Sequence, residues 1–236
     1  MDASGYVALS RQSGLLAQMD IIANNIANAS TSGFRREGMV FSEYVKAAGA
    51  EPSLSIGYGN VRVVDQMQGG LVQTGGSFDF AIEGDGFFLI DTPQGQQLTR
   101  SGNFAPGPDG TLVTTDGYKV LDAGGSTIFV PPNARNVTVA QDGTLSVNGV
   151  PLSQIGLWKA TDPLSLTHEA GTRFSSSGVE PVAGGRMMQG FVEDSNVDPL
   201  QEVASMIAVQ RAYEMGQNFL DREDDRARNV IQTLGR

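Results

Sequence analysis

The stretch that decides the fold is Asp198–Leu234, with the sequence DPLQEVASMIAVQRAYEMGQNFLDREDDRARNVIQTL. Asp198 is suited to cap a helix, and Pro199 is suited to the first helical position, where no backbone N–H is needed. No further proline follows, and Gly216 is the only glycine inside the stretch. The sequence therefore predicts one helix from Pro199 to Leu234, about 54 Å long at roughly 1.5 Å per residue.

Apolar or small residues recur every seven positions along this helix, at Met206, Tyr213, Leu220, Ala227 and Leu234. A seven-residue period is typical of helices that supercoil around a partner. The flanking positions are polar, most clearly over residues 221–229. A helix with such a narrow apolar stripe needs a partner, because helix propensity alone rarely stabilises it in water.

A second helix is predicted at the other end of the chain, over residues 4–28. It contains no proline, and Leu15, Met19, Ile22 and Ile26 form one stripe at spacings of four, three and four. The segment 30–33 ends the helix, since Gly33 suits a left-handed backbone conformation. Each terminal helix is the simplest partner for the other, so we expect them to pair.

The middle of the chain is predicted to be β structure. Most of the 30 glycines lie there, and turn pairs such as Asp116-Gly117 and Asn148-Gly149 separate short apolar runs. The tetrapeptide Asp-Gly-Thr-Leu occurs at 109–112 and again at 142–145, which indicates two similar hairpins. Another tight turn is expected at Gly84-Asp85-Gly86, between two strands.

The expected fold class is therefore α+β, with long N- and C-terminal helices paired as a coiled coil and a central, mainly antiparallel β domain. The predicted helical assembly domain comprises residues 1–33 and 195–236. The predicted β-rich domain comprises residues 34–194.

Composition excludes several classes of protein. The 236 residues carry a formal net charge of −10, with one histidine and no cysteine. These counts exclude disulfide frameworks, cysteine nucleophiles and multi-histidine metal centres, and the acidic balance argues against nucleic-acid binding. No signal peptide or apolar membrane span is apparent, which indicates either a cytoplasmic protein or export without a cleavable signal.

Few side chains suggest catalysis. Asp79, Glu83 and Asp85 could form a carboxylate pair for glycoside hydrolysis, but solvated strand and turn acids are the better interpretation. His168 has no second histidine or nucleophile motif beside it, and a surface or turn position is expected. The acids of residues 221–225 are interleaved with arginines, which favours ion pairs along a helix over a metal site.

Asn24, Asn25 and Asn28 crowd the end of the first helix, although asparagine is a poor helix former. One interpretation is fraying toward the turn at 30–33. The other is a polar element that fixes the register between adjacent helices or chains. Composition alone does not decide between them.

Three blocks of sequence resemble the flagellar rod, hook and hook-associated protein family. They are ANNIANASTSGFRR at 23–36, DFAIEGDGFF at 79–88 with LTRSGNF at 98–104, and EDSNVDP at 193–199 with MI at 206–207 and QRAYE at 210–214. The blocks follow the family's order along nearly the whole chain. The modest length, the opening Met1-Asp2 and the ending that runs from Arg222 to Arg236 resemble a proximal-rod member.

The resemblance implies a structural subunit, with no enzymatic activity, cofactor or metal. It implies export, unfolded, through the flagellar type III apparatus, without a cleavable signal peptide. It then implies helical polymerisation into the periplasm-spanning rod of the basal body, where the subunit transmits torque for motility. Partners would be copies of itself and other rod proteins, with neither nucleic acid binding nor direct membrane insertion.

Carried over from the family, the assembly contacts would come from both terminal helices. The residues are Leu15, Met19, Ile22, Asn24, Asn25, Ile26 and Asn28, with Val203, Ile207, Gln210, Arg211 and Tyr213.

Two other classes of function remain as alternatives. A secreted carbohydrate-active β protein, using the carboxylates at positions 79, 83 and 85, would bind glycans as a monomer. A free periplasmic binding module would have ordered chain ends and would not polymerise.

Overall fold

The structure is a computed structural model that describes residues 3–48, 51–132, 134, 136–182 and 184–234. Two pairs of residues used for the resemblance to a proximal-rod member, Met1-Asp2 and Gly235-Arg236, lie outside the described residues. The chain divides into two compact units. The helical unit comprises Met1–Ala27, Glu37–Val63 and Asp198–Arg236, and the β-rich unit comprises Asn28–Arg36 and Val64–Val197.

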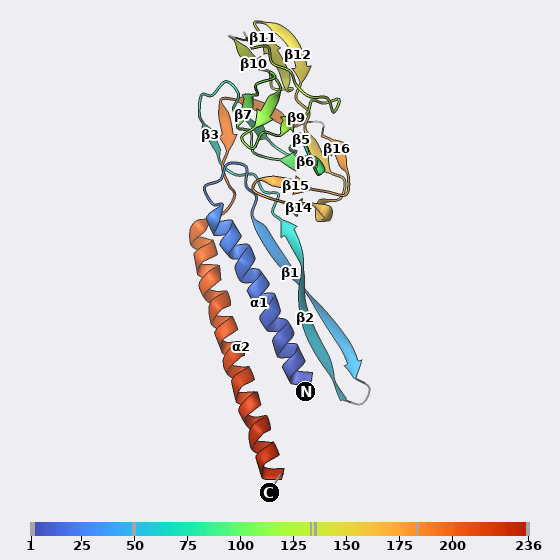
Figure 1. Cartoon of the computed structure of the whole chain (residues 1–236), viewed down its shortest axis with the longest axis vertical. Coiled ribbons are helices and arrows are strands. Elements are labelled where there is room, and N and C mark those ends of the chain that lie inside the picture. Colours follow the sequence, from blue (N-terminus) through green and yellow to red (C-terminus); the bar gives the residue numbers. More distant parts are fainter. Residues whose placement is uncertain (1–2, 49–50, 133, 135, 183, 235–236) are drawn as a thin grey trace. The chain divides into compact units, whose positions relative to one another are not determined.

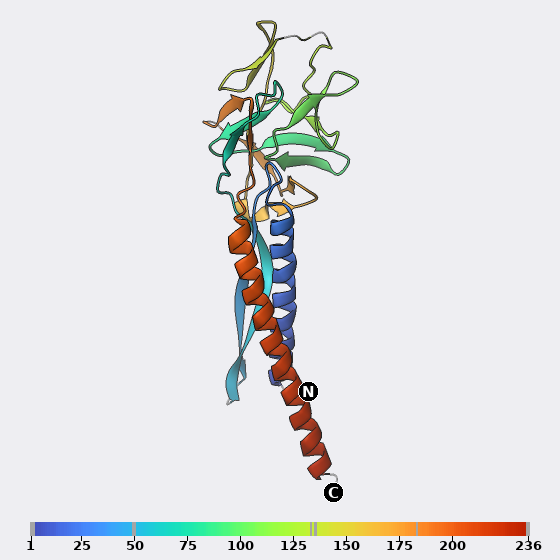
Figure 2. The same cartoon turned by 90° about the vertical axis from the view of Figure 1, so that its left-hand side faces the viewer.

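The helical unit contains two helices and one long hairpin (Figure 1). Its elements are α1 (Ala3–Ala27), β1 (Glu37–Ala48), β2 (Glu51–Val64) and α2 (Pro199–Leu234). Its helices lie side by side in both views (Figure 2). Strands β1 and β2 pair only with each other among the described residues. A two-stranded ribbon is marginally stable by itself, so the contact of β1 with α1 matters.

The start of α2 matches the prediction, and the helix continues to Leu234, the last described residue. The Asp198 carboxylate accepts hydrogen bonds from the backbone N–H groups of Leu200, at 2.9 Å, and Gln201, at 3.3 Å. These contacts satisfy two of the N–H groups that a helix leaves without intrahelical partners at its start. Pro199 occupies the first helical position, as expected.

The predicted coiled coil of two long paired helices is wrong. The helices differ in length, with 25 residues in α1 and 36 in α2. The hydrophobic cluster that joins them reaches no farther along α2 than Tyr213. The covered positions of α2 are Met206, Val209, Ala212 and Tyr213. The seven-residue stripe thus enters this cluster only at its first two positions, Met206 and Tyr213.

The β-rich unit contains sixteen short strands among the described residues. They are β3 (Leu71–Gln73), β4 (Phe80–Glu83), β5 (Phe88–Thr92), β6 (Gly95–Thr99), β7 (Phe104–Pro106), β8 (Leu112–Thr114), β9 (Lys119–Val120), β10 (Val137–Val139), β11 (Thr144–Val147), β12 (Val150–Gln154), β13 (Trp158–Ala160), β14 (Thr167–His168), β15 (Arg173–Ser175), β16 (Val179–Pro181), β17 (Arg186–Gln189) and β18 (Phe191–Glu193). A short 3₁₀ helix, Pro163–Ser165, precedes β14.

All strand pairs with a described register are antiparallel, as predicted. The largest sheet has the order β14-β15-β6-β5-β9-β8-β7. A three-stranded sheet, β10-β11-β12, and the pairs β13-β16, β17-β4 and β18-β3 complete the unit. Alternate side chains of β5 enter two hydrophobic clusters, Phe88 and Ile90 in one and Leu89 in the other. This alternation follows from the two-residue period of a strand.

The two Asp-Gly-Thr-Leu repeats form similar hairpin turns, as predicted. Asp109 accepts from the N–H and hydroxyl of Thr111, and Asp142 accepts from the same two groups of Thr144. The leucine that ends each repeat is fully buried. Hydrogen bonds lower the pKa of both carboxyls, that of Asp109 chiefly through the Thr111 hydroxyl and that of Asp142 chiefly through the Thr144 N–H.

The turn at residues 84–86 does not join paired strands. Strand β4 pairs with β17, whereas β5 pairs with β6 and β9. Gly84 and Gly86 both have a left-handed backbone, with φ of 100° and 120°. The turn therefore moves the chain from one sheet to another, which no local pattern around it indicates.

Candidate assembly interface

The contact between α1 and α2 has a small apolar centre. Leu15 and Ile22 of α1 pack with Val209 of α2, and Met19 and Ile26 flank them. Met206, Ala212 and Tyr213 complete the cluster from α2.

Beside this cluster the helices approach closely. The side-chain amide of Gln12 donates to the backbone carbonyl of Tyr213, at 3.0 Å. A Cβ atom at Gly216 would lie 2.2 Å from the same amide nitrogen. The only glycine inside α2 therefore makes room for a buried polar side chain of α1.

Asn25 fixes the register of the helical unit. Its side chain is fully buried, donates to the backbone carbonyl of Glu37 at 2.8 Å and accepts from the backbone N–H of Glu37 at 2.9 Å. The same amide nitrogen lies 3.3 Å from a carboxylate oxygen of Glu202 in α2. One amide thus ties α1 to the start of β1 and to α2. The asparagine cluster therefore contains a register element within one chain.

The sequence did not indicate Glu37 and Glu202 as the partners of Asn25. Glu37 and Glu202 are both almost completely buried, and Arg62 lies 3.6 Å from the carboxylate of Glu37. Glutamate is rarely buried unless it is paired, so composition favours a solvent-exposed position for both residues. The spacing of Asn25 from Glu37 carries no helical or strand periodicity that could have indicated the contact.

The face of α2 opposite α1 is exposed and apolar. At 100° per residue, Leu200, Val203 and Ile207 lie on the side of the helix away from Val209. Leu200 is 83% exposed, and Val203 and Ile207 are each 46% exposed. Isolated apolar side chains at a surface are normal, but successive turns of one helix face form a continuous stripe.

All of the predicted contact residues except Asn28 fall into two groups. Leu15, Met19, Ile22, Asn25, Ile26 and Tyr213 contact the rest of their own helical unit. Asn24, Val203, Ile207, Gln210 and Arg211 are exposed, and Gln210 donates to Glu214 one turn farther along. Asn28 lies in the turn after α1, where its side chain accepts from the Thr31 hydroxyl.

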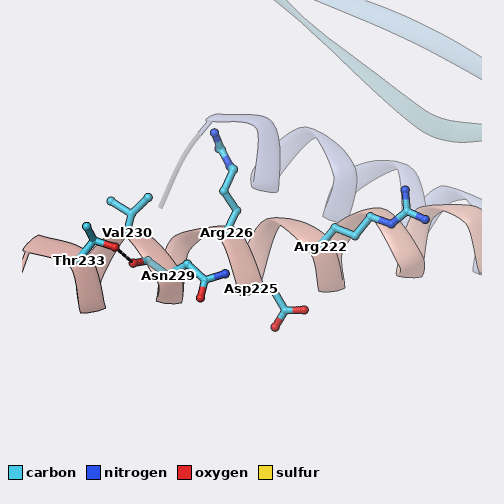
Figure 3. A pocket seen from close by; sticks show the side chains of 6 residues that line it. All are labelled: Arg222, Asp225, Arg226, Asn229, Val230 and Thr233. Atoms are coloured by element: carbon cyan, nitrogen blue, oxygen red, sulfur yellow. Dashed lines mark hydrogen bonds between the residues drawn. The ribbon is translucent and has the colours of Figure 1, made fainter.

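The last turns of α2 carry the predicted ion pairs. Arg226 bonds Glu223 at 2.6 Å, and Arg228 bonds Asp224 at 2.5 Å, both between successive helical turns. Six residues of these turns line an open hollow of about 590 Å³ (Figure 3). Side chains of α2 alone form its described lining, and no cluster of acidic or histidine side chains suited to a metal ion occurs among the described residues.

The other catalytic candidates are structural. Asp79 accepts from the Thr74 hydroxyl, at 2.5 Å, and from the Asn103 side chain, at 3.4 Å, while Glu83 and Asp85 are exposed. His168, for which a surface or turn position was expected, lies in strand β14 and is partly exposed. Its half-buried ring lies against two aromatic rings, with centroids 4.9 Å from Phe34 and 4.3 Å from Phe174.

An exposed apolar stripe along one helix, such as that of Leu200, Val203 and Ile207, is typical of proteins that bind other proteins. Within the described chain, neither helix is long and apolar enough to span a membrane.

Comparison with known families agrees with this class. Residues 6–35 match the model for flagella basal body rod proteins, and residues 81–147 match the flagellar hook protein FlgE/F/G D1 domain. Residues 188–233 match the C-terminal model of the flagellar basal body rod FlgEFG proteins.

Full-length relatives give the same result. The chain is 36% identical to the flagellar basal-body rod protein FlgF of Caulobacter vibrioides and 38% identical to FlgF of Mesorhizobium japonicum, with 100% of this chain and 99% of each relative covered. It is 30% identical to FlgG of Bacillus subtilis, with 97% of this chain and 96% of the relative covered. The chain belongs to the flagellar basal-body rod protein family and is a structural rod subunit of the flagellum, and its identity to these two FlgF proteins exceeds that to the Bacillus subtilis FlgG. The family resemblance found in the sequence is confirmed.

Proposed function

We propose that this chain assembles helically, with copies of itself and other rod proteins, into the proximal part of a periplasm-spanning rod that acts as a drive shaft. The observation that carries the proposal is the exposed apolar stripe on α2, formed by Leu200, Val203 and Ile207. Burying such side chains stabilises a contact by about 25 cal/mol per Å² of apolar surface. A rod of subunits packed through rigid helices would transmit torque for motility without any catalytic step.

Within this proposal, the exposed residues of the predicted set contact neighbouring subunits. They are Asn24, Val203, Ile207, Gln210 and Arg211. The buried residues of the set act earlier, because they hold α1 and α2 together as one surface. The proposed assembly part of the chain is residues 1–33 with 195–236. The hairpin of β1 and β2, which falls within the predicted central domain of residues 34–194, belongs to the helical unit.

The location of a rod in the basal body also decides how the subunit would be exported and which other partners it would have. The subunit would reach the basal body through the flagellar type III export apparatus, without a cleavable signal peptide. It would neither insert into a membrane nor bind nucleic acid, and it would need no cofactor.

The test replaces Ile207 by Asp in the chromosomal gene. The side chain is half-exposed in the single chain, so the purified variant should keep its helical content and thermal stability. In the assembled rod the carboxylate would lie in an apolar contact, where an unpaired charge is strongly unfavourable. We expect loss of swimming and basal bodies with a missing or truncated rod in electron micrographs.

The matched control is Gln201→Asp, an exposed polar position in the first turn of the same helix. An acidic side chain is favourable near a helix N-terminus, so this variant should swim normally. Normal swimming of the Ile207→Asp strain would contradict the proposed contact face.

A further inference from the structure

Three charged side chains meet in the interior of the β-rich unit. A single carboxylate, that of Glu193, lies between the guanidinium groups of Arg35 and Arg100. One oxygen is 2.9 Å from Arg35 Nη2, and the other is 2.5 Å from Arg100 Nε. All three side chains are at most 3% exposed. Charges buried to this degree are tolerated only with partners.

Backbone carbonyls satisfy most of the remaining donors. Arg100 donates to the carbonyls of Ile82, at 3.0 Å, and Gly84, at 2.6 Å, and also to that of Gly86. The 84–86 turn therefore folds around the Arg100 guanidinium. Its two left-handed glycines allow the carbonyls to converge on one cation.

Arg35 and Glu193 connect the cluster to a further segment. Arg35 donates to the carbonyl of Met67, and Glu193 accepts from the backbone N–H of Gly69, at 2.9 Å. Burial lowers the pKa of the Arg35 guanidinium, and the Glu193 carboxylate opposes that shift.

The segments that carry Arg35 and Glu193 lie side by side. The N–H of Gly33 donates to the carbonyl of Glu193 at 2.7 Å, and the N–H of Arg36 donates to the side chain of Asn196 at 2.6 Å. Residues 36 and 196 are 160 positions apart in sequence. Gly33 also packs against the Arg100–Ser101 backbone, because a Cβ there would lie 2.2 Å from the N atom of Ser101.

Each charge of the cluster comes from a different part of the chain. Arg35 ends the N-terminal family segment, Arg100 lies in the central one and Glu193 lies in the C-terminal one. A β-rich unit that folded before the C-terminal segment docked would bury two arginines without their carboxylate. Breaking a buried ion pair by removal of one partner is strongly destabilising, because an uncompensated charge remains inside.

We propose that the ion pairs of Arg35 and Arg100 with Glu193 act as a lock on the folded β-rich unit. The unit is then stable only after the two segments that carry Arg35 and Glu193, residues 28–36 and 190–197, have both docked on the core. Folding of this unit then depends on residues from near both ends of the chain. The lock is independent of assembly, since all three residues lie inside one unit of a single chain.

The experiment uses the full-length Glu193→Gln variant. Native-state hydrogen exchange is measured for the docking segments and for the core strands β5 and β6, and urea unfolding gives the equilibrium constant. The lock predicts a rise of more than about a hundredfold in the unfolding constant. It also predicts equal acceleration of exchange in the core strands and in the docking segments. Acceleration confined to 28–36 and 190–197 would overturn it.

The matched control is Glu180→Gln, which removes an exposed ion pair with Lys159, at 3.0 Å. Exposed pairs contribute little, so the unfolding constant should change by less than about fivefold.

If Glu193→Gln does not fold at all, Arg35→Gln is measured in the same way. This variant keeps the pair between Arg100 and Glu193 and releases only the N-terminal segment. Equal acceleration in the core strands and the docking segments supports the lock, and local acceleration alone overturns it.

Discussion

Replacing Asn25 by Ala should destabilise the helical unit more than any other single asparagine substitution in α1. Asn25 is fully buried and makes three hydrogen bonds, two to the backbone of Glu37 and one to the carboxylate of Glu202. Alanine would leave all three partner groups without those bonds. A buried polar group left unsatisfied costs roughly 1–3 kcal/mol, and partial relaxation lowers the sum, so we expect a loss of about 3 kcal/mol.

The assay is urea denaturation of the full-length protein, followed by circular dichroism at 222 nm, which reports on α1 and α2. The free energy of unfolding should fall by about 3 kcal/mol, a factor of roughly 150 in the unfolding constant. Asn24→Ala, at the exposed neighbouring position, is the control and should change the free energy by no more than about 0.5 kcal/mol. A change below about 0.5 kcal/mol for Asn25→Ala would refute the assignment of Asn25 as the register element.

Two further predictions concern the β-rich unit. Gly33→Ala should lower the free energy of unfolding by about 3 kcal/mol or more in urea denaturation, because φ is +77° and the new Cβ would lie 2.2 Å from the Ser101 nitrogen. Gly75→Ala has nearly the same φ, +73°, with open space around the Cβ, so it should cost only about 1–2 kcal/mol, and equal losses would show that the close approach is unimportant. Asp142→Asn should reduce the loss of stability in acid. The pKa of the Asp142 carboxyl is lowered in the folded state, so this group adds stability above its unfolded pKa, near 4. That stability is lost as the pH falls through the folded-state pKa. Urea midpoints measured from pH 5 down to pH 2 check this, and an unchanged pH dependence would contradict it.

Several elements could be predicted from short stretches of sequence. The Asp198 cap and Pro199 define the start of α2, and Gly33, with φ of 77°, ends the turn after α1. The two Asp-Gly-Thr-Leu repeats form the expected hairpin turns. In each case the controlling interaction lies within a few residues, so the residue types and their order carry it.

The apolar stripes were found as well, but their partners were not. A stripe with a seven-residue period indicates that a helix packs against something, and it does not state over what length. The tertiary structure limits the apolar cluster to the part of α2 up to Tyr213, and beyond it the polar side chain of Gln12 meets Gly216. It also decides that Val203 and Ile207 remain exposed while Val209 is buried.

The sequence by itself determined the two helices, the antiparallel β-rich middle and the family. Only the tertiary structure decided which polar residues are buried together: Asn25 with Glu37 and Glu202, and Glu193 with two arginines. The reason is physical. Helix caps and turns satisfy hydrogen bonds between near neighbours, whereas a buried charge is satisfied by groups that the folded chain brings from distant positions. No periodicity in the sequence indicates which distant groups will pair, so these partners are identified only from the packed structure.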